Sequence, residues 1–560
     1  MTAAFITATP PTPNGGLHVG HLAGPYIAAD VLRRHLSAFG IDTVMTTAMD
    51  DHQTYCQTAG LREGRPAGEI ADRYGDCIED TWRRAGVEFD VSVRPRRDAE
   101  HPALTRELFR ALYDAGHLVA RTLPVPWCAS CEHWLVEAFV KGACPHCGES
   151  SGGNACEACG RPNHCGDLVD PRCVVCDSAG ELRDLERLFF PLGRFEDELV
   201  AFWAQTRMPA HLRALCEAML AGGLPEIAVT QPGNWGVPVP VEGYEGQRIY
   251  VWFEMAPGYL HEARRGGEAA GVDPARLTHG DDVPFVQFFG FDNGYFHALL
   301  FPAAFRAYDP SIRLPTRFVV NEFYRLEGLK FSTSRRHAVW AADLLRDESP
   351  DVVRWHVLRD RPEGRQTNFT LDALAATRAR LEELWDGPIA RLLQACDGEV
   401  PVERPAGPEW EALRTSLLAT AAELRHAYGV EGFDPRRAVR LLEAMLSSIV
   451  DFGFAHEHAA GVASLRGLHR SALTAQLTAL QALAAWAAPI APGIAERVAA
   501  ITGYGGPMSA DVAALAPPVP GRPLAAPEGS VLDPAPGPAI RHSAAGREAA
   551  PAQIATSAHA

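Results

Sequence analysis

Lysine is almost absent from this chain. The 560 residues contain only two, Lys141 and Lys330, so arginine carries nearly all of the positive charge. The formal net charge is −17 at pH 7, which excludes the broadly basic surface of a general nucleic-acid binder. A local basic groove is still compatible with this composition. Because arginine is used almost everywhere else, each lysine is a candidate for a role that arginine would not fill.

Long hydrophobic runs are absent as well. No stretch approaches the roughly 20 apolar residues that a membrane-spanning helix needs. The opening residues, MTAAFITATPP, lack the basic region and apolar segment of a secretory signal. We therefore expect a cytoplasmic protein without a membrane partner. The length and the hydrophobic content of 47% predict a folded chain of several domains.

The first fifty residues predict a parallel α/β sheet. Residues 4–10 and the β-branched residues 41–49 have the character of buried strands, and residues 18–39 have helical periodicity. Gly40 provides the helix stop. A strand, a helix and a second strand in this order form a βαβ unit, in which the strands are parallel.

Polar residues cluster where these two strands end. His18 and His21 follow the first strand, and Asp50 follows the second. Ligands of parallel sheets bind beyond the carboxyl ends of the strands, so we expect these residues in one pocket. Imidazole donors beside the first amides of a helix suit a polyphosphate. The alternative is a structural or merely exposed histidine pair.

Eight of the 13 cysteines form four Cys-x-x-Cys pairs. Four thiolates fill a tetrahedral zinc site, so eight can hold two structural zinc ions. The middle two pairs are close in sequence and are expected to share one ion, and the outer two pairs the other. The alternative is a set of reduced thiols without metal. The pairs are Cys128/Cys131, Cys144/Cys147, Cys156/Cys159 and Cys173/Cys176.

A basic segment beyond the middle of the chain contains one of the two lysines. Lys330 begins the sequence KFSTSRR, which includes Ser332 and Arg335. Lysine, hydroxyl groups and arginines in one loop suit transient binding of a triphosphate. The alternative is an ordinary solvated basic loop.

The rest of the chain divides into strands, helices and a tail. Strand-like runs occur at 248–253, 283–290 and 316–324, and helical periodicity begins near residue 371. Residues 507–560 contain no Phe, Trp or Tyr and many Ala and Pro, which is typical of a disordered tail.

Together these motifs resemble the methionyl branch of the class I aminoacyl-tRNA synthetases. His18-Val19-Gly20-His21 is similar to the family's HIGH signature, and the segment from Lys330 to Ser334 is similar to its KMSKS signature. The cysteine pairs resemble the methionyl zinc domain. Further matches are YVWFEMAPGY at 250–259, GFDNGYFH at 290–297 and APIAPGIAERV at 488–498.

This resemblance implies a Rossmann-like catalytic domain with an inserted zinc-knuckle domain and a C-terminal helical bundle. The expected divisions are the first catalytic half at 1–115, the connective insertion with its knuckles (128–176) at 116–235, the second catalytic half at 236–325, the KMSKS-like and stem-contact region at 326–370, the helical anticodon-binding region at 371–505 and a disordered tail at 506–560.

The resemblance also implies an activity. ATP and Mg²⁺ would activate an amino acid as its adenylate, and the aminoacyl group would then pass to tRNA. By this resemblance the catalytic residues are His18, His21 and Lys330. ATP would also contact Gly290, Asp292, Ser332 and Arg335. The amino acid, methionine or a more polar analogue, would contact Pro10, Thr12, Asp50, Trp252, Tyr259, Asn293 and His297.

Some positions depart from the family pattern. Thr333 replaces a lysine of the KMSKS signature, Thr12 a tyrosine, and Asn293 an aliphatic residue of the methionine pocket. Gln231 and Pro232 stand where an Arg-Asp pair is expected. The Asn-rich first helix and the Pro-Trp pair that would read anticodon bases in the family are also missing from 382–393 and 447–461.

These departures leave two alternatives open. One is a paralogue that adenylates a different amino acid and passes it to an acceptor other than tRNA. The other is a catalytically silent paralogue that binds an amino acid, tRNA or a protein.

Overall fold

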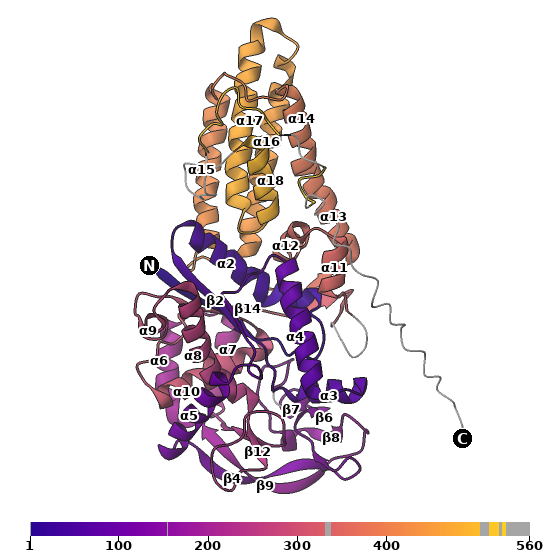
Figure 1. Cartoon of the computed structure of the whole chain (residues 1–560), viewed down its shortest axis with the longest axis vertical. Coiled ribbons are helices and arrows are strands. Elements are labelled where there is room, and N and C mark those ends of the chain that lie inside the picture. Colours follow the sequence, from indigo (N-terminus) through magenta and orange to yellow (C-terminus); the bar gives the residue numbers. More distant parts are fainter. Residues whose placement is uncertain (1, 154, 331–337, 504–514, 526–528, 534–560) are drawn as a thin grey trace, which may run out of the picture.

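The computed structural model describes residues 2–153, 155–330, 338–503, 515–525 and 529–533. The molecule is elongated, with an α/β body at one end and a bundle of long helices at the other (Figure 1). Within these described ranges, no helix is both long and apolar enough to cross a membrane.

A five-stranded parallel sheet lies at the centre of the α/β body. The strand order is β14-β13-β1-β2-β3, and every neighbouring pair is parallel. This arrangement confirms the expected α/β fold with a parallel sheet. The strands are β1 (Ala3–Ala8), β2 (Asp42–Ala48), β3 (Val91–Val93), β13 (Phe285–Gly290) and β14 (Arg317–Asn321).

Both faces of β1 are buried, because alternate residues pack into different hydrophobic clusters. Ile6 belongs to the cluster that includes Trp355, whereas Phe5 packs with Ala263 on the opposite face. The helices of this body are α2 (Ile27–Ala38), α3 (Thr54–Glu63), α4 (Ala67–Arg84), α5 (Glu100–Asp114), α8 (Val251–Ala270), α9 (Pro274–His279) and α10 (Phe301–Tyr308).

The expected strand at 248–253 is mostly wrong. Strand β12 covers only Gln247–Ile249, and α8 begins at Val251. A short run of aromatic and branched residues is apolar on every face, so its sequence alone does not separate a strand from a buried helix. The twenty residues of α8 include eleven more buried residues beyond this run, which place the helix in the core.

The expected helix at 18–39 is interrupted near its start. It consists of α1 (Val19–His21), the π-helical stretch η1 (Leu22–Tyr26) and α2. Pro25 cannot donate a backbone hydrogen bond, and the dihedral angles of Gly24 are not helical. A Cβ at Gly24 would lie 3.2 Å from Oδ1 of Asn321, so the glycine permits close packing against the end of β14.

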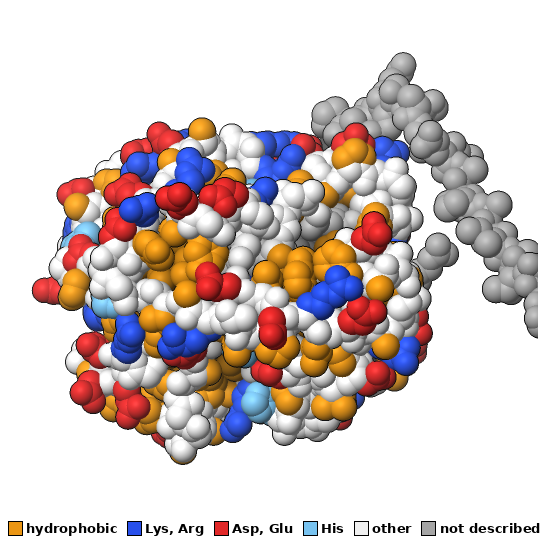
Figure 2. All heavy atoms as spheres, turned by 90° about the horizontal axis from the view of Figure 1, so that it is seen from below, with side chains coloured by type: hydrophobic (Ala, Val, Ile, Leu, Met, Phe, Trp, Pro, Cys, Tyr) orange, Lys and Arg blue, Asp and Glu red, His pale blue; other side chains and the backbone are white. Residues whose placement is uncertain are grey.

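An antiparallel insertion occupies the end of the body opposite the helical bundle. Figure 2 views this end and shows acidic, basic and hydrophobic side chains interspersed, without one continuous basic patch. The long pair β4 (Val119–Cys128) and β9 (Glu181–Pro191) joins β5 (His133–Trp134) and β10 (Glu226–Ala228) in one sheet. Between β5 and β9 in sequence, a smaller sheet forms from β6 (Glu137–Ala143), β7 (Ser150–Gly153) and β8 (Val169–Cys173).

The chain returns from this insertion through short elements. They are α6 (Glu196–Gln205), α7 (Ala210–Ala221) and the two-stranded sheet of β11 (Thr230–Pro232) and β12. After the parallel sheet, a three-stranded sheet forms from β15 (Tyr324–Leu326), β16 (Leu329–Lys330) and β17 (Thr367–Phe369).

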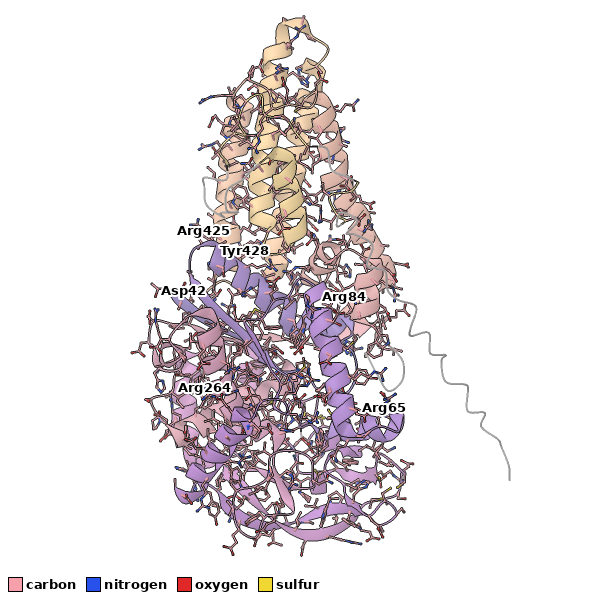
Figure 3. The ribbon with its side chains drawn as sticks, viewed as in Figure 1. Asp42, Arg65, Arg84, Arg264, Arg425 and Tyr428 are labelled. Carbon is pink, nitrogen blue, oxygen red and sulfur yellow. The ribbon has the colours of Figure 1, made fainter. Side chains whose placement is uncertain are left out.

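The C-terminal region is helical, as the periodicity beyond residue 371 predicts. Arg425 and Tyr428 lie at the base of α15, where this region meets α2 (Figure 3). The rings of Tyr428 and His35 have centroids 5.2 Å apart, and the Arg425 guanidinium lies 4.6 Å from the Phe39 ring. The helices are α11 (Ala341–Asp347), α12 (Pro350–Arg359), α13 (Leu371–Leu381), α14 (Gly387–Ala395), α15 (Pro408–Tyr428), α16 (Pro435–His456), α17 (Arg466–Ala487) and α18 (Pro492–Thr502).

The expected disordered tail at 506–560 is wrong for residues 515–525 and 529–533. Val531 and Leu532 are fully buried, and Asp533 forms an ion pair of 2.8 Å with Arg378 on α13. These two adjacent apolar residues hold the segment against the helical region. Two residues have little effect on a composition averaged over about fifty, so the composition did not reveal them. The other residues of the expected tail lie outside the described part of the chain.

One buried guanidinium joins the α/β body to the helical region. Arg354 on α12 donates to Oδ2 of Asp30 on α2 at 2.6 Å, and to the carbonyl oxygens of Gly86, Pro489 and Ile490. Both members of the Arg354–Asp30 pair are fully buried. Several acceptors from distant segments therefore converge on one cation.

Replacing Arg354 with alanine should lower the free energy of unfolding by about 3 kcal/mol, because the buried carbonyl oxygens of Pro489 and Ile490 would lose their donor. Asp30 would lose one of its two arginine partners and keep Arg34, whose Nε lies 2.7 Å from Oδ2 of Asp30. Arg359→Ala is the matched control, since Arg359 lies on the same helix and is half exposed. Urea denaturation followed by circular dichroism measures both. Equal losses in the two variants would contradict the role given to Arg354.

Candidate active site

The candidate site lies at the point where the strand order of the parallel sheet reverses, between β1 and β13. Strand β1 pairs with β2 on one side and β13 on the other, so the loops that follow β1 and β13 leave the sheet side by side. The amide of Thr9 donates to the carbonyl of Phe288 at 2.9 Å and holds the two strand ends together. This edge is a general ligand site of parallel sheets.

Gly290 and Asp292 occupy the loop after β13. A Cβ at Gly290 would lie 2.5 Å from Oδ1 of Asp292, so a side chain here would displace that carboxyl group. Burial raises the pKa of Asp292 to about 6. Asn293 lies beside it, with Nδ2 at 3.5 Å from Oδ1 of Asp292. Asn293, which was predicted to contact the amino acid, therefore lies beside two residues that were predicted to contact ATP.

The two histidines of the HVGH sequence are stacked. Their ring centroids are 3.8 Å apart, and the backbone N–H of His18 donates to Nδ1 of His21 at 3.1 Å. Burial lowers the pKa of His21 to about 4, so its ring is neutral at pH 7. Since Nδ1 accepts a hydrogen bond, Nε2 carries the ring proton and is a hydrogen-bond donor.

The segment that follows the KMSKS-like sequence is hydrogen-bonded to the histidine segment. The amide of Val19 donates to the carbonyl of Val339 at 3.0 Å, and the amide of Ala341 donates to the carbonyl of Leu17 at 2.8 Å. Lys330 ends β16, eight residues before the chain is described again. Ser332 and Arg335 lie outside the described residues. The loop therefore begins in β16 and ends against His18, which pairs with Trp340.

A pocket beside these loops contains three of the predicted amino-acid contacts, Pro10, Asp50 and Tyr259. Asp50 is buried at the end of β2, and its amide donates to the carbonyl of Pro11 at 3.0 Å. Burial raises the pKa of Asp50 well above its usual value, and nearby carboxylates including Glu137 and Glu254 raise it further. Within the described residues, no basic side chain forms an ion pair with Asp50.

Two histidines and a glutamate form the far wall of this pocket. Oε1 of Glu254 lies 2.7 Å from Nδ1 of His52 and 2.9 Å from Nε2 of His101. Burial raises the pKa of Glu254, but the two histidines outweigh this effect and hold the pKa at about 2. The sequence analysis missed Glu254 and His101. The signal available for Glu254 was a charged residue inside the apolar stretch that begins α8.

Other predicted amino-acid contacts lie outside that pocket. Trp252 stacks on Phe296, with centroids 3.9 Å apart. His297 stacks on Phe289 at 4.0 Å, and burial lowers the pKa of His297 to about 3. The His297 ring lies 5.8 Å from the Tyr259 ring, which connects it to the pocket wall. Thr12 is half-buried in the loop after β1.

The eight paired cysteines gather into two groups of four, and within each group the sulfur atoms lie within 4.8 Å of one another. The sulfur atoms of Cys128 and Cys176 are 3.4 Å apart, and those of Cys147 and Cys156 are 3.6 Å apart. Tetrahedral Zn–S bonds of about 2.3 Å require S–S distances near ~3.8 Å, so both donor sets fit zinc. The groups are Cys128, Cys131, Cys173 and Cys176, and Cys144, Cys147, Cys156 and Cys159.

This grouping is the one expected from the sequence, with the outer pairs together and the middle pairs together. Cys165 belongs to neither group, because its thiol donates to the carbonyl of Gly153 at 3.1 Å.

Known proteins of similar sequence share one description. A methionine–tRNA ligase of Thermomicrobium roseum is 31% identical over 509 residues, which cover 88% of this chain and 86% of that protein. One from Dehalococcoides mccartyi is 33% identical over 370 residues, covering 65% of this chain and 66% of that protein.

The fold is also found among solved structures. The Mycobacterium tuberculosis methionyl-tRNA synthetase bound by methionyl-adenylate superposes with a TM-score of 0.78 at 21% identity. The match covers 95% of this chain and 100% of that one. The sequence model of the family described as tRNA synthetases class I (M) matches residues 4–386. The chain therefore belongs to the class I tRNA synthetases, in the family denoted M.

Proposed function

We propose that this chain activates methionine with ATP as methionyl-adenylate and transfers the methionyl group to tRNA. The observation that carries the proposal is the pair of hydrogen bonds from Val19 to Val339 and from Ala341 to Leu17. They hold residues 339–341, which follow the KMSKS-like sequence, against the histidine segment. This contact supports one site formed from two signature segments more than 300 residues apart in sequence.

In the first step, the methionine carboxylate attacks the α-phosphorus of ATP and pyrophosphate leaves. His18 and His21 follow the carboxyl end of β1, and their ring N–H groups donate to phosphate oxygens. Lys330, Ser332 and Arg335 bind the outgoing phosphates, and Mg²⁺ that enters with ATP shares their charge. Gly290 and Asp292 contact the adenosine. These groups accelerate the step by orientation and by stabilising charge on the transferring phosphate.

Asp50 receives the ammonium group of the amino acid. Its buried carboxylate has no cationic partner among the described residues, and the surrounding acids oppose its ionisation. A substrate ammonium would supply the missing positive charge. Pro10, Thr12, Tyr259, Trp252, Asn293 and His297 shape the adjoining side-chain pocket.

In the second step, the terminal ribose hydroxyl of tRNA attacks the adenylate carbonyl and AMP leaves. We assign the anticodon end of the tRNA to the helical region 371–505 and the stem contacts to 326–370. The halves 1–115 and 236–325 form the catalytic domain.

The insertion 116–235 carries the knuckles. The two cysteine groups would each hold a structural zinc ion, which would cross-link the strands and turns of the small sheet. Each ion would have all four positions filled by cysteine thiolates, so it would stabilise the fold and would take no part in adenylation.

Amino-acid-dependent exchange of labelled pyrophosphate into ATP tests the proposed activation step. We expect exchange with methionine and its loss in His21→Ala, because the adenylate forms reversibly at this site. Charging of methionine tRNA tests the second step. Exchange with a different amino acid, or none across a broad panel, would contradict the proposal, as would exchange without tRNA charging.

Lys330→Ala should slow exchange at least about 100-fold, because an ammonium facing the leaving pyrophosphate is lost. Lys141→Ala is the matched control, since Lys141 is the other lysine and pairs with Asp177 on the knuckle surface at 2.6 Å. Steady-state exchange rates measure both. An unchanged rate in Lys330→Ala would remove the assigned role of this loop.

A further inference from the structure

A second cavity of about 170 Å³ lies between the knuckle insertion and the parallel-sheet body. It shares no lining residue with the pocket around Asp50. Asn163 and His164 come from the knuckle segment, Arg187 from β9, and Tyr250 and Tyr295 from the start of α8 and the loop after β13. This volume has room for a molecule of a few non-hydrogen atoms.

Arg187 is a charged group of this cavity that lacks a counter-ion among the described residues. Its side chain is 4% exposed, its guanidinium carbon lies 5.3 Å from the centre of the Phe189 ring, and neither Nε nor Nη2 has a hydrogen-bond partner in the described part of the chain. No carboxylate of the described residues lies within ion-pair distance of it. Burial lowers the pKa of Arg187. A guanidinium withdrawn from water without a counter-ion costs several kcal/mol, an arrangement that a bound anion would offset.

A second unsatisfied group lines the same cavity. The Nδ2 group of Asn163 donates to the Ser151 hydroxyl at 3.2 Å, whereas the buried Oδ1 atom has no hydrogen-bond partner. This oxygen needs a donor. The cavity therefore offers a planar cationic fork and a separate acceptor.

We propose that this cavity binds a small carboxylate that also carries a hydroxyl or amino group. The carboxylate pairs with the Arg187 guanidinium, whose planar fork matches two carboxylate oxygens. The hydroxyl or amino group donates to Oδ1 of Asn163. A carboxylate suits the cavity better than a phosphate dianion, because one guanidinium supplies the positive charge and Asp167 also lines the wall.

Saturation-transfer NMR on the full chain tests this site, with glycolate as the probe and acetate as the analogue without a hydroxyl group. We expect a glycolate signal stronger than that of acetate, and its retention when ATP and methionine are present. Arg187→Gln should reduce the glycolate signal at least about five-fold. Arg183→Gln, a half-exposed arginine on the same strand, should keep it.

Absence of a glycolate signal, or the same signal in Arg187→Gln, would overturn the proposal. Equal signals from glycolate and acetate would overturn the role of Asn163. Displacement of glycolate by equimolar inorganic phosphate would overturn the choice of a carboxylate.

The melting temperature provides a measurement that does not need a ligand. Arg187→Met removes the buried charge and keeps the side-chain length, so the melting temperature without carboxylate should be equal to or above that of the unchanged chain. A clear fall would mean that the guanidinium is already satisfied in the free protein, and would overturn the proposal.

Discussion

Two backbone hydrogen bonds are the constraint on which the site depends. Val19 to Val339 and Ala341 to Leu17 hold the segment after the KMSKS-like loop against the histidine segment. Because backbone groups form both hydrogen bonds, they do not depend on the identity of the side chains at these four positions. The described residues on either side are Lys330 at the end of β16 and Trp340, which forms an isolated β-bridge with His18.

Electrostatics divides the site into two halves. The nucleotide half contains stacked imidazoles, and burial keeps the pKa of His21 low enough for a neutral donor at pH 7. The amino-acid half is acidic, with Asp50 near Glu137 and Glu254. Glu254 is held ionised by His52 and His101, whereas Asp50 has no basic partner among the described residues. Under the proposed function, this difference leaves Asp50 for a substrate ammonium, while Glu254 is bound within the protein itself.

The sequence predicted elements whose signals are local. Short runs of apolar and β-branched residues identified β1 and β2, and the Cys-x-x-Cys spacing predicted both cysteine groups. Prediction from the sequence failed where packing against distant residues determines the local structure. The expected strand at 248–253 gives way to a helix that begins at Val251, and Val531 and Leu532 anchor a segment of the expected tail. Glu254 and Arg187 were missed because a charged residue reveals its burial only after its neighbours are placed. The assignments of Ser332 and Arg335 are predictions from the sequence.

Acetylation of the two lysines, followed by mass spectrometry, tests most directly whether the histidines and the KMSKS-like loop form one nucleotide site. Our account predicts that ATP protects Lys330 and leaves Lys141 equally reactive. The protection should disappear when His18 and His21 are both replaced with alanine. Protection of neither lysine, or protection of Lys330 that survives the loss of both histidines, would contradict the account.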